Sequence, residues 1–206
     1  ADAAELARRL AADPDVEFAE PNGRQRRLQA VPPNDPLYAS GPALSPSTFS
    51  GGPEVGQWYL RAPDNTFKAA INMPVAWARG FGNTSVVVAV LDTGVRFEHP
   101  DLGGRISAGG RLLDGYDFVT RPSVAGDGDA RDADASDPGD WIDANDRANP
   151  VFASCDVADS SWHGTATASL VGAAANNAIG MAGTAPGVRV LPVRVLGKCF
   201  GQDSDI

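Results

Sequence analysis

The chain has 206 residues, of which 43% are hydrophobic, and this is enough for one globular domain or for part of a larger one. Its formal net charge of −9 disfavours a phosphate backbone as a partner, so we expect no nucleic acid among its ligands. The longest apolar runs are far too short to cross a bilayer, and we expect no membrane partner. Apolar segments recur between the many glycines and prolines, which predicts defined turns in a folded chain.

The N-terminal stretch predicts a short helix followed by a short strand. Leu6 and Leu10 lie one helical turn apart and share a face, and Pro14 ends the helix. Apolar and charged residues alternate in VEFAE (16–20), which predicts a half-exposed strand. The basic stretch RQRR (24–27) that follows suits a linker or a cleavage site.

Two further segments precede the first strongly apolar run. Residues 30–57 are rich in Pro, Gly and Ser and have no period, which predicts a linker or an extended arm. The segment AINMPVAWARGFG (70–82) predicts a short helix with Pro74 near its start and Gly80 at its end.

A run of six apolar residues, VVVAVL (86–91), ends at the carboxylate of Asp92. Such a run predicts a strand buried on both faces, as in the middle of a parallel sheet. Asp92 then lies at the carboxyl end of the strand, where open α/β sheets keep their ligand and catalytic groups. The alternative is an ordinary turn, because Asp-Thr-Gly is favourable turn chemistry and Gly94 adopts positive φ freely.

The segment 126–146 contains eight aspartates and one arginine. A stretch of this composition is most simply a solvated loop. Weak calcium binding is the alternative, although the spacing does not match the ligand pattern of an EF-hand loop.

From Gly164 to Ala175 nearly every side chain is small, and His163 stands directly before this run. Small side chains allow a helix to lie very close to its neighbours, so we expect a buried helix with a histidine at its start. A lone histidine is often purely structural. Residues 188–197, VRVLPVRVLG, predict a second apolar strand.

Taken together and in this order, the segments VLDTG, HPDL, HGT, NNAIGMAGTAP and VLPVRVLG resemble the subtilisin-like serine proteases (subtilases), and most of all their thermitase-like secreted branch. The resemblance covers residues 86–206 and implies an α/β fold, a mostly parallel sheet with helices on both faces, of which this chain holds the N-terminal half. VEFAEP resembles the last strand of the inhibitory propeptide of the family. The resemblance therefore implies two regions, with the end of a propeptide in residues 1–29 and the first part of the catalytic domain in residues 30–206.

The resemblance implies that Asp92 and His163 are two members of a catalytic Asp-His-Ser triad. In such a triad the buried carboxylate accepts the Nδ1–H of the histidine and stabilises the imidazolium that forms. The GTSMA-like segment that carries the serine and the oxyanion-hole asparagine do not occur in these 206 residues, so we expect a C-terminal half to supply them. The helix also departs from the family, with HGTATAS in place of HGTHVAG. The other histidine, His99, lies in the structural turn HPDL.

The resemblance further implies a secreted endopeptidase whose partners are polypeptide substrates and its own propeptide as an inhibitor. In the family, the segment after the second strand pairs with extended substrate as an added β-strand. The matching positions are Leu196 for a side-chain pocket, and Phe200 and Gly201 for the pairing edge.

A structural calcium ion is the cofactor that the resemblance implies, and it would clamp the N-terminal arm against the core. Calcium prefers six to eight hard oxygen ligands. The implied ligands are the side chains of Asp35, Asp101 and Asn177 and the carbonyls of Ala174, Ile179 and Met181. The alternatives are ordinary turn residues at these positions, or an ion site in the acidic stretch instead.

The two cysteines, Cys155 and Cys199, form no CxxC or Cys/His cluster that indicates zinc. In a secreted chain an even cysteine count favours a disulfide between them. Two buried free thiols are the alternative.

Three other functions compete with a serine protease. A catalytically inactive pseudoprotease could keep the scaffold as a calcium-binding module. An aspartic protease also has Asp-Thr-Gly after an apolar run, but it needs two such carboxylates and this chain has one. A Rossmann-type nucleotide binder would need a G-x-G-x-x-G segment after its strand, which is not found here.

Overall fold

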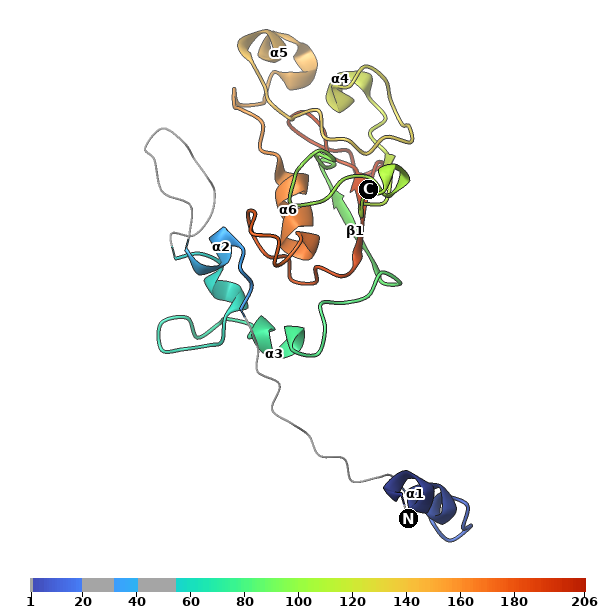
Figure 1. The fold of residues 1–206 in the computed structure, drawn as a ribbon. Helices are drawn as coiled ribbons and strands as arrows, with labels where there is room; N and C mark the ends of the chain where they lie inside the picture. Colours follow the sequence, from blue (N-terminus) through green and yellow to red (C-terminus); the bar gives the residue numbers. More distant parts are fainter. Residues whose placement is uncertain (1, 20–31, 41–54) are drawn as a thin grey trace.

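A computed structural model describes residues 2–19, 32–40 and 55–206. Figure 1 shows the course of the chain through its helices and strands. In chain order the elements are α1 (Ala3–Ala11), α2 (Pro36–Ala39), η1 (Trp58–Leu60), α3 (Met73–Trp77), β1 (Val87–Asp92), η2 (Ile106–Ala108), β2 (Tyr116–Asp117), α4 (Pro122–Ala125), α5 (Ala144–Ala148), η3 (Pro150–Phe152), α6 (His163–Gly172) and β3 (Arg189–Arg194).

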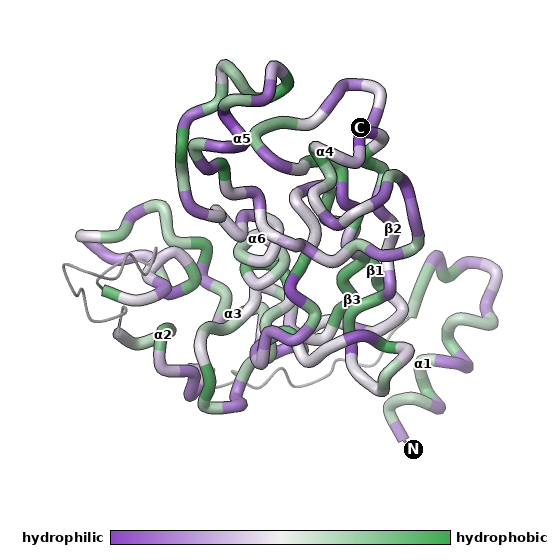
Figure 2. Tube along the Cα trace, turned by 90° about the horizontal axis from the view of Figure 1, so that it is seen from above, coloured by the Kyte–Doolittle hydropathy of each residue, from purple (hydrophilic) through white to green (hydrophobic). Residues whose placement is uncertain are grey.

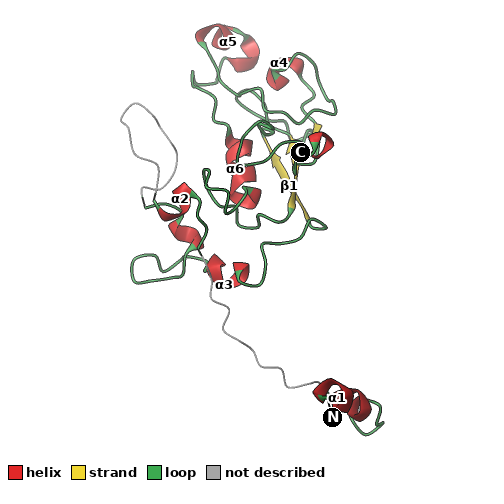
Figure 3. Ribbon diagram, viewed as in Figure 1, coloured by secondary structure: helices red, strands yellow, loops and turns green. Residues whose placement is uncertain are grey.

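The strands form a parallel sheet in the order β1-β3-β2, with β3 in the middle. Figure 3 shows the strands in yellow beside the helices. β1 pairs with β3 along its whole length, from Val87 opposite Arg189 to Asp92 opposite Arg194. β2 pairs with the carboxyl end of β3 through Tyr116 and Asp117. This sheet with its helices confirms the predicted subtilase-type α/β fold.

The longest helix, α6, packs against β1 and β3. The core between them includes Val90 of β1, Val190 of β3 and Ala168 of α6. Figure 2 shows hydrophobic residues along β1 and β3, where the described part of the chain is densest. Small side chains on α6 allow this close approach, because a Cβ added at Gly172 would lie 2.7 Å from the Val190 side chain.

The prediction that the apolar run 86–91 is buried on both faces was wrong. Val90 and Asp92 are buried beneath α6, whereas Val87 and Leu91 on the opposite face are 48% and 51% exposed. Alternate strand residues point to opposite faces of a sheet, and α6 covers only one of those faces. The apolar run therefore marks one packed face and one uncovered face in the described structure.

The N-terminal helix is confirmed as α1, which ends before Pro14. The strand predicted for 16–20 was wrong where it is described, because residues 16–19 form no strand and Phe18 is exposed. A strand needs a neighbouring strand with which it forms backbone hydrogen bonds. An alternation of apolar and charged residues does not by itself supply that neighbour. The basic stretch 24–27 lies outside the described residues.

The predicted arm at 30–57 is described in part and contains the short helix α2. Tyr38 of α2 packs against Trp77 of α3, with ring centroids 5.9 Å apart, and joins a buried cluster with Leu60 and Ala182. This part of the arm is therefore held against the domain. α3 is shorter than the predicted 70–82 helix, although Pro74 lies in its first turn as expected. None of the helices in the described ranges is both long and apolar enough to span a bilayer.

Candidate active site

Asp92 is the last residue of β1, and its side chain lies on the face of the sheet that α6 covers. The strand alternates exposed and buried positions, which leaves Asp92 only 5% exposed. One carboxylate oxygen accepts a hydrogen bond from the backbone N–H of Thr93 at 2.8 Å. The carboxylate is therefore buried and oriented before any partner side chain is considered.

His163 is the first residue of α6, and its Nδ1 lies 2.8 Å from both carboxylate oxygens of Asp92. The histidine side chain is 67% exposed, so the burial of the pair is carried by Asp92. Nε2, on the other side of the ring, makes no hydrogen bond within the described residues. A carboxylate at Nδ1 favours the tautomer with the proton on Nδ1, which leaves the Nε2 lone pair open to an incoming proton.

The start of α6 lies directly against the Asp-Thr-Gly turn. The Gly164 backbone N–H donates to Thr93 Oγ1 at 3.0 Å. A side chain at Gly164 would have no room, since its Cβ would meet Gly94 O at 2.1 Å. At the next residue, Thr165 Oγ1 accepts from the Arg96 N–H at 2.9 Å. These contacts set the distance between the strand that carries Asp92 and the helix that carries His163.

The acidic stretch enters the site at two positions that the sequence analysis did not single out. The Thr93 hydroxyl donates to Asp137 at 2.7 Å, and Asp137 is 4% exposed. Burial raises the pKa of Asp137 above its ordinary value. Asp140 accepts from both the N–H and the hydroxyl of Ser161, at 2.6 and 2.7 Å. Their place in Asp-Pro-Gly-Asp, a strong turn sequence, was the only sequence signal that could have separated them from the other aspartates.

The other aspartates of this stretch mostly have partners of their own. Asp134 pairs with Arg105, Asp146 with Lys198, and Asp143 caps the N-terminus of α5. Across the described ranges no group of three or more His, Cys, Asp or Glu side chains is arranged to hold a metal ion.

A buried ion pair lies behind the Asp-Thr-Gly turn. The Arg194 guanidinium, on β3, donates to the carboxylates of Asp117 and Asp127 and to the carbonyls of Ala125 and Thr93. Asp117 is fully buried, and this burial raises its pKa to about 6 despite the opposing effect of Arg194.

His99 is not part of the Asp92–His163 pair, and its Nδ1 accepts from the Asp101 N–H at 3.3 Å within the HPDL turn. This is the structural place that the resemblance implies for it.

The residues of the predicted calcium set come together around the loop 174–181. Asp35 accepts from the backbone N–H groups of Asn176 and Asn177, at 2.8 and 3.4 Å. Asp101 accepts from Asn177 Nδ2 at 2.9 Å and from the Met181 N–H at 2.8 Å. Asp35 and Asp101 are each 1% exposed.

This set has the donor chemistry that a hard cation needs. Neither Asp35 nor Asp101 has a Lys or Arg within ion-pair distance in the described ranges, so their charge is not offset by a direct ion pair. Burial, with a smaller contribution from the charge of Asp35, raises the pKa of Asp101 above its ordinary value. The three carbonyls of the set, at Ala174, Ile179 and Met181, accept no hydrogen bond from the described residues.

The predicted substrate segment follows β3. The Leu196 N–H donates to the carbonyl of Asp92 at 3.2 Å, so this segment lies beside the catalytic strand. Both backbone groups of Phe200 are used within its own turn, by Lys198 O and the Gly197 N–H. Gly201 makes no backbone hydrogen bond with the described residues. The free edge is therefore at Gly201, while the Phe200 ring packs near Phe152.

The structure joins Cys155 and Cys199 in a disulfide, as predicted, across 44 positions of sequence. The bond ties the segment before α6 to the predicted substrate segment after β3. Both ends therefore border the region that contains His163 and Gly201.

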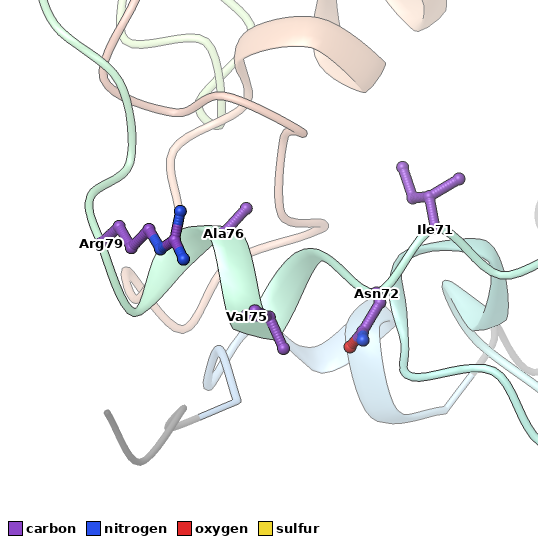
Figure 4. A pocket seen from close by; sticks show the side chains of 5 residues that line it. All are labelled: Ile71, Asn72, Val75, Ala76 and Arg79. Atoms are coloured by element: carbon purple, nitrogen blue, oxygen red, sulfur yellow. The ribbon is translucent and has the colours of Figure 1, made fainter. Parts of the chain in front are cut away.

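A surface pocket lies along α3 (Figure 4), and none of the predicted site residues lines it. Its lining is mainly apolar, with Ile71, Asn72, Val75, Ala76 and Arg79. No carboxylate, thiol or imidazole lines it, so it offers no general base or nucleophile.

Two known proteins are similar to this chain over nearly all of its length. An extracellular protease of Xanthomonas campestris pv. campestris is 40% identical over 206 residues, which cover 100% of this chain and 30% of that protein. An extracellular basic protease of Dichelobacter nodosus is 37% identical over 197 residues, covering 96% of this chain and 28% of that protein. The chain thus spans less than a third of the length of these two relatives.

A solved structure of proteases from Pseudoalteromonas arctica is 40% identical, with a TM-score of 0.61 over 85% of this chain and 42% of that chain. The sequence profile of the subtilase family matches residues 83–206 of this chain. This part contains the sheet, Asp92 and His163. The chain therefore belongs to the subtilase family.

Proposed function

We propose that this chain is part of a secreted serine endopeptidase and contributes the aspartate and the histidine of its catalytic triad. One observation carries the proposal: His163 Nδ1 lies 2.8 Å from a buried carboxylate, while the histidine side chain is 67% exposed and Nε2 makes no hydrogen bond with the described residues. The subtilase family membership and relatives named extracellular proteases support the same activity. The serine and the oxyanion-hole donor come from a C-terminal region of the complete enzyme.

In the proposed mechanism, His163 Nε2 takes the proton of that serine as the serine attacks a peptide carbonyl. Asp92 holds the proton on Nδ1 and stabilises the imidazolium that forms. The imidazolium then protonates the leaving amine, which leaves an acyl-enzyme. A water molecule, deprotonated by the same Nε2, hydrolyses the acyl-enzyme and releases the second product.

The substrate is a polypeptide that lies in extended form along the segment after β3. The backbone groups of Gly201 make no hydrogen bond with the described residues, and such groups suit the addition of a substrate strand. Leu196 borders a side-chain pocket. Phe200 belongs to the same edge through its position, although its own backbone groups are already bonded.

Residues 1–29 form the end of an inhibitory propeptide, and residues 30–206 begin the catalytic domain. α1 is the one helix among the described residues of the first region. The proposed boundary lies among residues 20–31, outside the described ranges.

Calcium is the proposed structural cofactor. Asp35, Asp101 and Asn177 would hold the ion with the carbonyls of Ala174, Ile179 and Met181. When bound, the ion supplies positive charge between two buried carboxylates that have no direct cationic partner in the described ranges. The site then links Asp35 of the arm to Asp101 of the domain.

An aspartic protease is a weaker fit to the same residues. That mechanism needs the Asp-Thr-Gly carboxylate to face a second carboxylate. Here the oxygens of Asp92 are engaged by His163 Nδ1 and the Thr93 N–H.

The test uses the complete enzyme, with this chain and its C-terminal region, on a peptide substrate. His163→Ala should abolish nearly all turnover, and Asp92→Asn should lower kcat about 10⁴-fold, because the wrong tautomer is then favoured. His99→Ala is the matched control and should retain activity. A wild-type enzyme without peptidase activity would support the pseudoprotease alternative. Full activity in His163→Ala would exclude the proposed mechanism.

A further inference from the structure

The helix that carries the proposed catalytic histidine has no cap of its own. The first backbone N–H groups of a helix have no partner within it and are usually bonded by the side chain of the N-cap residue. In α6 the N-cap residue is Trp162, which is left-handed (φ 51°) and whose side chain caps nothing. The N–H groups of His163 and Gly164 must therefore be satisfied from elsewhere.

Two hydroxyls take the place of the missing cap. The Gly164 N–H donates to Thr93 Oγ1 at 3.0 Å, and the His163 N–H donates to Ser161 Oγ at 3.3 Å. A hydroxyl has one proton to donate and two lone pairs to accept with, so its rotation decides whether a lone pair faces the helix.

Each of these hydroxyls donates its proton to a carboxylate of the acidic stretch. Thr93 Oγ1 donates to Asp137 at 2.7 Å, and Ser161 Oγ donates to Asp140 at 2.7 Å. The carboxylates thereby turn the lone pairs toward the helix, and they polarise the hydroxyls so that these accept more strongly. The result is two parallel chains of carboxylate, hydroxyl and N–H, which end at consecutive residues of α6.

The two carboxylates come from one turn, Asp137-Pro-Gly-Asp140. Asp137 also accepts from the Gly139 N–H at 2.9 Å, and its own N–H donates to Val95 O at 3.0 Å. Gly139 has φ 105° and a Cβ there would lie 2.5 Å from Ser160 Oγ. The turn is therefore bonded both internally and to the segment that follows β1.

Burial is the largest effect on the pKa of Asp137 and raises it, whereas the hydrogen bonds from Thr93 and Gly139 favour the ionised carboxylate and lower it. The Arg194 guanidinium also donates to the carbonyl of Thr93, so the Asp-Thr-Gly turn is held from both sides.

From these contacts we infer that Asp137 and Asp140 are positioning residues for the proposed reaction: they act through Thr93 and Ser161 to hold the first turn of α6, and with it His163, in place against Asp92. Neither residue touches substrate in this role. The inference rests on the proposed function, since it assigns the two aspartates to the same catalytic pair.

The test is a double-mutant cycle in the complete enzyme. Asp137→Asn is close to isosteric but cannot accept from both Thr93 and Gly139, and Thr93→Val removes the hydroxyl. Each should lower kcat about 10- to 100-fold with KM little changed, because a small misplacement of the base is costly and no substrate contact is lost. The double variant should lose no more than the worse single variant, because both changes break one chain. Asp140→Asn and Ser161→Ala should behave as a second such pair.

Asp129→Asn is the matched control, since it makes the same charge change at an exposed position of the same stretch. It should leave kcat unchanged. A second readout is the NMR signal of the His163 Nδ1 proton, which should move in Asp137→Asn and in Thr93→Val but not in the control. This readout reports on the pair even in an enzyme with no activity.

The outcomes separate the inference from the proposed function. If the wild type is active, His163→Ala is inactive and folded Asp137→Asn has wild-type kcat and an unmoved Nδ1 proton signal, the positioning role is wrong and the proposed function stands. Losses that multiply in the double variant would also overturn it, because they would show two independent effects. A lowered melting temperature with unchanged kcat would reduce Asp137 to a purely structural residue.

Discussion

A β-carbon placed on Gly164 would lie 2.1 Å from the carbonyl oxygen of Gly94, so only glycine allows the helix and the turn to meet at this point. Gly94 belongs to the turn after Asp92, and Gly164 follows His163. The backbones that carry Asp92 and His163 therefore meet directly, and the side chains of this proposed catalytic pair are joined by a contact of 2.8 Å.

Gly164→Ala should separate these two backbones. Because Gly94 cannot yield without moving the strand, we expect a loss of roughly 1–3 kcal/mol of stability from overpacking. Activity should fall more than stability, since the distance from Asp92 to His163 changes with it. Thermal denaturation and peptide hydrolysis by the complete enzyme would measure both. Ala166→Ser, at an exposed position of α6, is the control, and equal behaviour of the two variants would contradict the prediction.

Asp101→Asn should remove most of the calcium response of the complete enzyme. A ligand that binds only the folded state at 100 times its Kd adds about 2.7 kcal/mol of stability. The wild type should therefore melt at a lower temperature in chelator, and the variant should show little difference. Differential scanning calorimetry with and without calcium would measure this, with the exposed Asp203→Asn as control. A wild-type calcium response in the Asp101 variant would instead direct attention to the acidic stretch.

The Cys155–Cys199 bond should contribute strongly to stability because it closes a loop of 44 positions. In the chain-entropy view a loop of this size is worth roughly 4 kcal/mol, and we expect about 2–4 kcal/mol to be lost in the Cys155→Ser, Cys199→Ser double variant. Denaturant unfolding of the complete enzyme with and without reductant would measure it. Reductant should destabilise the wild type and leave the double variant unchanged, and two alkylatable thiols in the unreduced wild type would disprove the bond.

The buried carboxyl of Asp117 should make stability depend on pH in the acid range. Burial raises its folded pKa to about 6, above its unfolded value, so the folded state binds the proton more tightly than the unfolded state. Its contribution to the free energy of unfolding is then fully present below about pH 4 and decreases as pH rises to about 6.

Asp117→Asn cannot titrate, so the stability of the wild type relative to this variant should fall over that pH interval. Loss of one Arg194 partner lowers the stability of the variant but leaves this slope unchanged. Urea unfolding of the complete enzyme at several pH values would measure the slope. A constant difference between the two proteins would show that Asp117 stays ionised throughout.

The strands and the small-residue helix were predictable because each depends on a local pattern. The run before Asp92 predicted a strand, and the small residues after His163 predicted a closely packed helix. What the run could not predict is how many of its faces are covered. That depends on the elements above and below the sheet, and the exposed Leu91 shows that one face is open in the described structure.

The roles of Asp137 and Asp140 could not be predicted in the same way. Eight aspartates in 126–146 look alike in sequence. The two that reach Thr93 and Ser161 are selected by the fold, because those hydroxyls lie on other segments of the chain. Such a contact produces no periodic pattern in the sequence. The Pro-Gly turn between the two aspartates is its only sequence signal.

The parallel pairing of β1 with β3 has a consequence for the order in which the enzyme assembles. Val87 pairs with Arg189, about one hundred positions away, and Asp92 meets His163 across 71 positions. Contacts of such long range form slowly, because the ordering of a long loop precedes any gain from closing it. A nascent chain with only its local helices formed therefore has no assembled aspartate–histidine pair. We expect proteolytic capacity to arise late in folding. By then most of the domain is already compact and resists cleavage by other molecules of the same enzyme.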